Sequence, residues 1–120
     1  MQSAAARVVL VVAAVVALVL SAGLMGTEPR PYVVTAIDYH FHDAHPTFPI
    51  GPDRDLVVKN QGRNVHNVTI PALDYSRNVR PGEQLTIGDI ADRLSPGRYL
   101  LICRIHRALG MSGVIVIAAE

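Results

Sequence analysis

The sequence has no tryptophan, few other aromatic residues and no cluster of basic residues. Nucleic-acid binding usually depends on aromatic side chains that stack on bases and on basic side chains that contact phosphates. Eleven basic residues oppose ten acidic ones, and one of the eleven, Arg7, lies beside an apolar N-terminal segment. Residues 27–120 are therefore close to neutral. This composition excludes nucleic acid as the partner.

Cysteine and methionine are equally scarce. Cys103 is the only cysteine, so no disulfide can form within the chain, and Met111 is the only methionine after Met25. A single cysteine in an exported domain suggests an intermolecular bond, an exposed reactive thiol or a metal ligand. The length of 120 residues allows one domain, assigned to residues 27–120.

One long hydrophobic run is present, and it extends from Val8 to Met25. As a helix, about 18 uncharged residues would span roughly 27 Å, close to the thickness of a bilayer core. Residues 1–26 are interpreted either as a signal peptide, with a plausible cleavage site at 21–23, or as an uncleaved membrane anchor. Either interpretation places residues 27–120 outside the cytoplasm, in the periplasm or at the cell surface. A buried core helix is the remaining alternative.

Short alternating segments separated by turn signals follow this run, as expected for strands. We predict strands at 32–41, 55–60, 65–70, 83–88, 98–104 and 112–118, with a possible helical turn near 87–94. The fold class is therefore all-β, a Greek-key antiparallel β-sandwich preceded by one N-terminal apolar helix.

The first predicted strand, 32–41, also has a predicted orientation. Its alternation assigns Asp38 and His40 to one face, and to the other face Val33, Thr35, Ile37, Tyr39 and Phe41.

Four donor side chains point to a metal. Cys103, His106 and Met111 lie on the connection between the last two predicted strands, and His66 lies on an earlier one. Side-chain parity allows His66 and Cys103 to face the same interior. A thiolate, two imidazoles and a thioether form the soft donor set of a redox-active copper site. We therefore predict that these four residues bind one copper ion, which changes between Cu(I) and Cu(II).

The segments 97–116 and 64–68 resemble the cupredoxins, the small blue type 1 copper proteins. The spacing of the donors is similar to that of plastocyanin, pseudoazurin and halocyanin, and the resemblance covers nearly all of residues 32–118. It implies that His66, Cys103 and His106 are equatorial ligands and that Met111 is the weak axial ligand. Asn67 would connect the two ligand segments. The implied function is electron transport between redox partners, without catalysis.

The resemblance also implies where a partner docks. Electrons would leave through the edge of His106, inside an apolar patch to which Ala108, Leu109 and Pro71 could contribute. The expected partner is another redox protein that binds transiently to a monomer of this chain. Arg104 and Arg107 could steer an acidic partner, or they could be solvated arginines without such a role.

Two alternatives stay open. His40, His42 and His45 form either a second, exposed metal-binding ridge, together with Asp38, or the polar face of an edge strand. The second alternative concerns function: the chain could bind copper outside the cytoplasm for sequestration or delivery. An enzyme is not predicted, because a copper enzyme needs a second, substrate-binding metal and an inward-facing thiolate is hard for a substrate to reach.

Overall fold

The computed structural model describes residues 30–44, 47–48 and 54–119. In these residues the chain forms strands with three short helical turns, η1 (Pro71–Leu73), α2 (Ile90–Arg93) and η2 (Arg107–Leu109). The strands are β1 (Tyr32–Ile37), β2 (His40–His42), β3 (Thr47–Phe48), β4 (Leu56–Asn60), β5 (His66–Ile70), β6 (Tyr75–Val79), β7 (Gln84–Ile87), β8 (Gly97–Ile102) and β9 (Ser112–Ile117).

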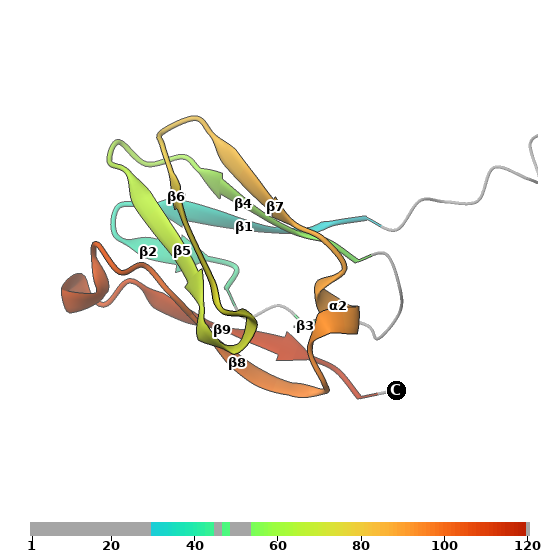
Figure 1. Cartoon of the computed structure of the whole chain (residues 1–120). Helices are drawn as coiled ribbons and strands as arrows, with labels where there is room; N and C mark the ends of the chain where they lie inside the picture. The colour runs from blue at the N-terminus through green and yellow to red at the C-terminus, as the bar shows by residue number, and fades with distance from the viewer. Residues whose placement is uncertain (1–29, 45–46, 49–53, 120) are drawn as a thin grey trace, which may run out of the picture.

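The strands form two sheets that face each other as the layers of a sandwich (Figure 1). One sheet has the order β2-β1-β4-β7, and the other has the order β3-β9-β8-β5-β6. The predicted all-β sandwich is confirmed, but the sheets are not purely antiparallel. Strand β1 pairs with β4 in parallel, and β3 pairs with β9 in parallel. Parallel neighbours need long connections, so these pairs could not be inferred from turns between adjacent strands.

The hydrophobic core lies between the two sheets. Leu56 and Val58 from β4, Val68 from β5 and Leu101 from β8 are each fully buried. Val68 lies between the polar residues Asn67 and Thr69, whereas Leu101 lies between Leu100, which is 43% exposed, and Ile102, so the neighbours of the core residues are not always polar. Burial of aliphatic side chains at this interface is the main stabilising contribution to such a fold.

The predicted strand 32–41 is in fact two strands, β1 and β2, separated by a turn at Asp38–Tyr39. Val33, Thr35 and Ile37 do share a face of β1, but it is not the buried face. Val34 and Ala36 are fully buried, whereas Val33 is 37% exposed. The turn reverses the chain, so that Ala36 pairs with Phe41 and both lie in the core.

The predicted strands at 55–60, 65–70, 83–88 and 112–118 are confirmed within one or two residues at each end, and so is a helical turn within 87–94. Strand β6 was not predicted. Most of its residues are exposed and polar, as expected for an edge strand, so it lacks the hydrophobic alternation on which the prediction relied. Strand β8 ends at Ile102, which leaves Cys103 outside the ladder.

The connections that matter for the site meet at one end of the sandwich. The β1–β2 turn, the start of β5 and η2 lie together at the left of Figure 1, whereas α2 and the end of β9 lie at the right. Among the residues that the structure describes, no helix is long and apolar enough to cross a membrane. The predicted apolar helix and the division at residue 26 fall outside the described residues.

Candidate metal centre

The β8–β9 connection carries three of the predicted ligands. Cys103 follows β8 directly, His106 precedes η2, and Met111 precedes β9. The N–H of Cys103 donates to the carbonyl of Met111 at 3.0 Å, and the N–H of Met111 donates to the carbonyl of His106 at 3.3 Å. Gly110 allows the sharp return with a positive φ of 83°. The connection is therefore a closed loop that brings its two ends together.

His66 reaches this loop from the other side, as the first residue of β5. The turn before it is held by Asn60, whose buried side-chain amide donates to the carbonyls of Asn64 and Val79 at 2.8 and 2.9 Å. The carbonyl oxygen of the Asn60 side chain accepts from the N–H of Gly62 at 2.8 Å. These bonds set the entry of the chain into β5 and so the position of His66.

The three strongest donors converge. Nδ1 of His66 lies 3.2 Å from Nδ1 of His106, and Nδ1 of His106 lies 3.7 Å from Sγ of Cys103. These atoms form a group with all separations within 4.8 Å, the only such cluster of His, Cys, Asp and Glu in the described part of the chain. His66 and Cys103 are fully buried, and His106 is partly exposed. Met111 is fully buried in the adjoining core.

The chemistry of these donors fits a transition metal. Two imidazole nitrogens that face each other across a short distance, with a sulfur beside them, provide converging lone pairs without a carboxylate among them. Soft sulfur and imidazole donors favour copper or zinc over calcium or magnesium. A trigonal arrangement of two histidines and one cysteine is typical of copper sites that transfer electrons.

Asn67 connects the two ligand segments. Its backbone N–H donates to Sγ of Cys103 at 3.2 Å, and its side-chain oxygen accepts from the N–H of Arg104 at 3.2 Å. The same side chain bonds to Thr69, Ser76 and Asn78 on the outer side of β5 and β6. The predicted role of Asn67 as a connection between the segments agrees with these contacts.

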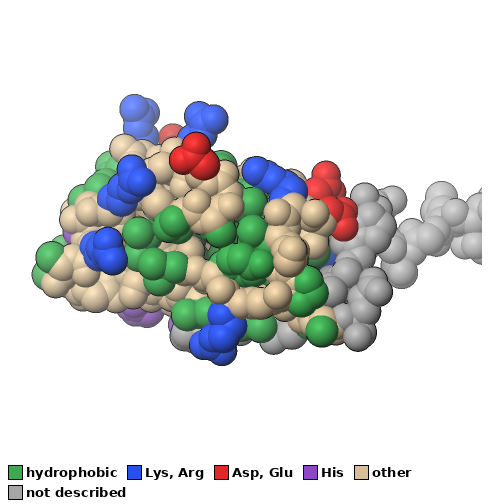
Figure 2. Space-filling view, turned by 60° about the horizontal axis from the view of Figure 1, so that its bottom comes forward, with side chains coloured by type: hydrophobic (Ala, Val, Ile, Leu, Met, Phe, Trp, Pro, Cys, Tyr) green, Lys and Arg blue, Asp and Glu red, His purple; other side chains and the backbone are tan. Residues whose placement is uncertain are grey.

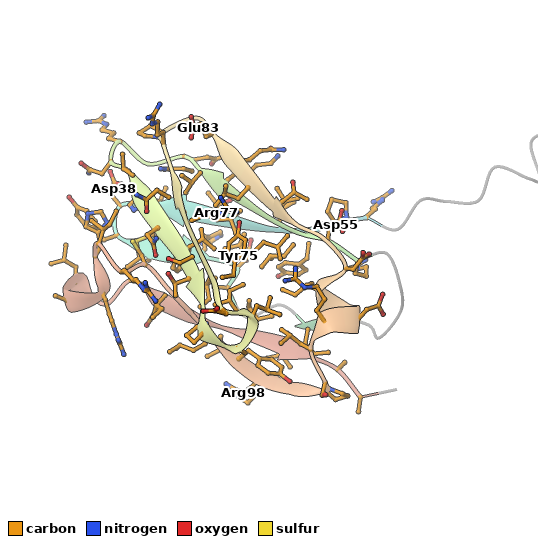
Figure 3. All side chains as sticks on the ribbon, viewed as in Figure 1. Asp38, Asp55, Tyr75, Arg77, Glu83 and Arg98 are labelled. Atoms are coloured by element: carbon orange, nitrogen blue, oxygen red, sulfur yellow. The ribbon has the colours of Figure 1, made fainter. Side chains whose placement is uncertain are left out.

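A carboxylate lies behind His66. Nε2 of His66 donates to Oδ1 of Asp38 at 2.7 Å. The backbone N–H of Arg63, which donates to Oδ2 of Asp38 at 2.9 Å, holds the pKa of Asp38 below its ordinary value. Partial burial opposes this shift, and the hydrogen bond from His66 adds to it. Figure 3 shows Asp38 at the loop end of the sandwich, whereas Asp55 lies at the opposite end.

A model of the cupredoxin-like domain family matches residues 9–117, most of the chain. The chain belongs to this family. The resemblance predicted from the sequence is thus confirmed. Cupredoxins bind copper, and His66, Cys103 and His106 form the candidate site for it in this chain.

Solved structures with the cupredoxin fold are similar to the chain at low sequence identity. Auracyanin from Roseiflexus castenholzii, solved after reduction with dithionite, is 20% identical over 78% of this chain and all of that one, with a TM-score of 0.61. A purple cupredoxin from Nitrosopumilus maritimus is 11% identical over 72% of this chain and 99% of that one, with a TM-score of 0.57. A comparison with curated protein sequences finds no match.

A larger protein shares the fold as well. A copper-containing nitrite reductase from Thermus scotoductus is 21% identical over 79% of this chain, with a TM-score of 0.62. The chain spans only 24% of that reductase. At this identity the similarity describes the cupredoxin fold and not the activity.

The sequence did not predict that Asp38 contacts His66 or that Tyr39 contacts His106. Asp38 had been placed on the outer ridge with His40 and His42, but its carboxylate points to His66 instead. One signal was available, because aspartate is uncommon within strands and favours turns. His40 and His42 are exposed with ring centroids 6.4 Å apart, and His45 lies outside the described residues.

The predicted apolar patch is wrong in one member. Pro71 follows Ile70 at the end of β5 opposite His66, so it cannot lie beside His106. Ala108 and Leu109 are exposed next to His106, as predicted. Tyr39, Val65 and Ile105 are also exposed at this end, by 41%, 40% and 51%.

Proposed function

We propose that this cupredoxin transfers single electrons between redox partners through one type 1 copper site. The proposed ligands are His66, Cys103 and His106, with Met111 as the weak axial donor. The observation that carries the proposal is the convergence of Sγ and the two Nδ1 atoms within 4.8 Å at the closed end of a β-sandwich. Bound copper would supply a one-electron couple between Cu(I) and Cu(II).

The residues around the site hold the donors in one arrangement. His66 begins β5 and Cys103 follows β8, its neighbour in the same sheet, and Asn67 links the two segments, so the donors need to move little when the charge of the metal changes. Complete burial of Cys103 keeps water and other thiols away from its sulfur. A scaffold of this kind suits repeated electron transfer better than a flexible surface site would.

His106 is the proposed exit for the electron, because it is the only one of the four proposed ligands with a partly exposed side chain. Four exposed apolar residues are neighbours of the two histidines in sequence or in space, namely Tyr39, Val65, Ile105 and Leu109. Hydrophobic and basic side chains occur together at the left end of Figure 2, the end at which η2 lies in Figure 1. A small apolar contact favours a transient complex with a redox protein.

We propose an acidic rim on this partner. Arg104 and Arg107 flank His106 in sequence, and Arg63 precedes His66 by three residues; all three are exposed. Positive charge around the exit would raise the rate of encounter with a negatively charged surface. The proposed assembly is a monomer that meets its partner transiently.

We also propose that residues 27–120 work outside the cytoplasm, with residues 1–26 as the export signal or anchor. This proposal relies on the uncharged run from Val8 to Met25. Catalysis is not proposed. Within the described residues there is a single cluster of metal-binding donors, and the chain spans only 24% of the reductase that shares its fold.

The test is the visible spectrum of the full chain with one equivalent of Cu(II), before and after ascorbate. We expect an intense thiolate-to-copper band that disappears on reduction and is absent from the variant Cys103→Ser. The variant His42→Gln, which removes an exposed histidine outside the donor cluster, should keep the band. Weak absorption that is the same in wild type and Cys103→Ser would contradict the proposal.

Chelator competition separates electron transfer from copper delivery. A buried site should hold Cu(I) against a competing chelator for much longer than the time of electron exchange. Rapid loss of copper would instead favour sequestration or delivery as the function.

A further inference from the structure

The β1–β2 turn touches both candidate histidine ligands, although it contributes no ligand itself. Oδ1 of Asp38 accepts from Nε2 of His66 at 2.7 Å. The ring of the next residue, Tyr39, lies against His106, with centroids 4.7 Å apart and planes inclined by 55°. One turn from the opposite sheet therefore braces the two rings whose Nδ1 atoms face each other.

The carboxylate of Asp38 is itself held in place. Its other oxygen accepts from the N–H of Arg63 at 2.9 Å, and its side chain is only 21% exposed. Gly62 leaves room for the contact, because a Cβ atom at this position would lie 2.8 Å from Nε2 of His66 and would collide with Asp38. Asp38 is thus held by two hydrogen bonds, with Oδ1 toward His66 and Oδ2 toward Arg63.

This arrangement determines which nitrogen of His66 carries a proton. A carboxylate accepts hydrogen bonds, so Nε2 of a neutral His66 must be the protonated nitrogen. The other nitrogen, Nδ1, then has a free lone pair and faces Nδ1 of His106. A histidine that donates to a carboxylate in this way is a stronger metal donor and is fixed in orientation.

We propose that Asp38 is a positioning residue for the metal centre, and that its charge lowers the reduction potential of the bound copper. The proposal rests on the proposed copper site. A negative charge and a stronger imidazole donor both favour Cu(II) over Cu(I). Removal of the charge should therefore make Cu(I) relatively more stable and raise the potential.

The first test uses the metal-free full chain. Long-range nitrogen–proton NMR correlations report which ring nitrogen of His66 carries the proton. We expect protonation at Nε2 in the wild type and a mixture of tautomers in Asp38→Ala. A wild-type His66 protonated at Nδ1 would overturn the proposal without any reference to copper.

The second test measures the reduction potential of copper-loaded protein. In Asp38→Asn we expect the preference for Cu(II) over Cu(I) to fall about tenfold, an upward shift of about 59 mV for one electron. Asp74→Asn is the matched control. It removes the same charge from an exposed residue at the far end of β5, with a left-handed backbone that asparagine tolerates. Asp38→Glu keeps the negative charge, so its reduction potential should lie between those of the wild type and Asp38→Asn.

The outcomes separate the two proposals. A wild-type protein with the thiolate-to-copper band, but with equal potentials for Asp38→Asn and Asp74→Asn, would overturn the role of Asp38 alone. A wild-type protein without the band would overturn both proposals. If Asp38→Asn does not fold, the tautomer measurement on the wild type decides.

Discussion

The backbone N–H of Asn67 donates a hydrogen bond to Sγ of Cys103 at 3.2 Å, across 36 positions of sequence. Asn67, which directly follows the candidate ligand His66, therefore holds the sulfur of the candidate ligand Cys103. The side chain of Asn67 strengthens this connection through its bond from the N–H of Arg104, the residue after Cys103. The two ligand segments are thus linked at adjacent positions by backbone and side chain.

Replacement of Asn67 by alanine should weaken this connection in the metal-free protein. The N–H of Arg104 would lose its acceptor, and the hydroxyl of Thr69 would keep only its contact with Oγ of Ser76 at 2.8 Å. We expect the free energy of unfolding to fall by about 1–3 kcal/mol, the cost of partly buried polar groups without partners. Urea unfolding measures this change. Asn78→Ala removes only one bond to Asn67 and should cost less; equal losses in the two variants would argue against the linking role.

Gly62→Ala should disturb the environment of His66. The added methyl group would lie 2.8 Å from Nε2 of His66 and would displace Asp38. We expect a loss of about 1–3 kcal/mol in stability, typical of overpacking, together with weaker copper binding. Gly88→Ala is the control, because its Cβ would meet only Asp55 at an ordinary distance of 3.6 Å. Thermal unfolding and copper titration measure the stability and the copper affinity of both variants. Equal values for Gly62→Ala and Gly88→Ala would mean that the β1–β2 turn moves aside freely.

Met111→Leu separates the packing role of Met111 from its proposed role as axial ligand. Leucine fills a similar volume in the core, so stability should change by less than about 1.5 kcal/mol. Loss of the weak thioether donor should destabilise Cu(II) more than Cu(I), so the reduction potential should rise while the visible band remains. Voltammetry measures the potential. An unchanged potential would mean that Met111 only packs in the core.

The arginines near His106 should affect the rate at which charged reagents react. For the anionic reagent hexacyanoferrate, we expect the wild type to react faster at low salt and the double variant Arg104→Glu/Arg107→Glu to react about tenfold more slowly. Added salt should reduce the difference, because it screens exposed charges. Stopped-flow kinetics measure both effects.

The control for this experiment is Arg98→Glu, an exposed residue of β8 that Figure 3 places away from the loop end. It should change the rate only slightly. A similar decrease in Arg98→Glu would mean that net charge, and not the position of the arginines, controls the reaction.

Acid should remove part of the stability of the metal-free protein. The N–H of Arg63 and the hydrogen bond from His66 hold the pKa of Asp38 below its ordinary value of 3.8. Because the pKa of Asp38 is lower in the folded protein, the unfolded chain binds the proton more readily. The stabilisation is therefore complete at pH values above the pKa of the unfolded chain, and it is lost as the pH falls through the lower pKa of the folded protein. Urea unfolding of wild type and Asp38→Asn at several pH values should show a difference that fades in acid. A difference independent of pH would exclude the charge as its origin.

The sequence was sufficient to predict the sandwich and to propose the candidate donors, because both inferences depend on short-range patterns. The order Cys103, His106, Met111 lies within one connection, and its spacing is readable without coordinates. Strands β4, β5 and β9 are short segments that contain valine or isoleucine, and β-branched residues of this kind favour strands. Parity along β5 and β8 was enough to direct His66 and Cys103 inward, where both are fully buried.

Only the tertiary structure decided which residues support the donors. Asp38 and His66 are 28 positions apart, and their contact requires the β1–β2 turn, which breaks a segment whose alternation suggested a single strand. Strand β6 forms because β5 offers it backbone hydrogen bonds, and its own polar residues give no comparable signal. Periodicity records which face of a segment is buried, but it does not record which segments become neighbours. The candidate donors are therefore evident from the sequence, whereas Asp38, the residue that supports His66, is identified only by the fold.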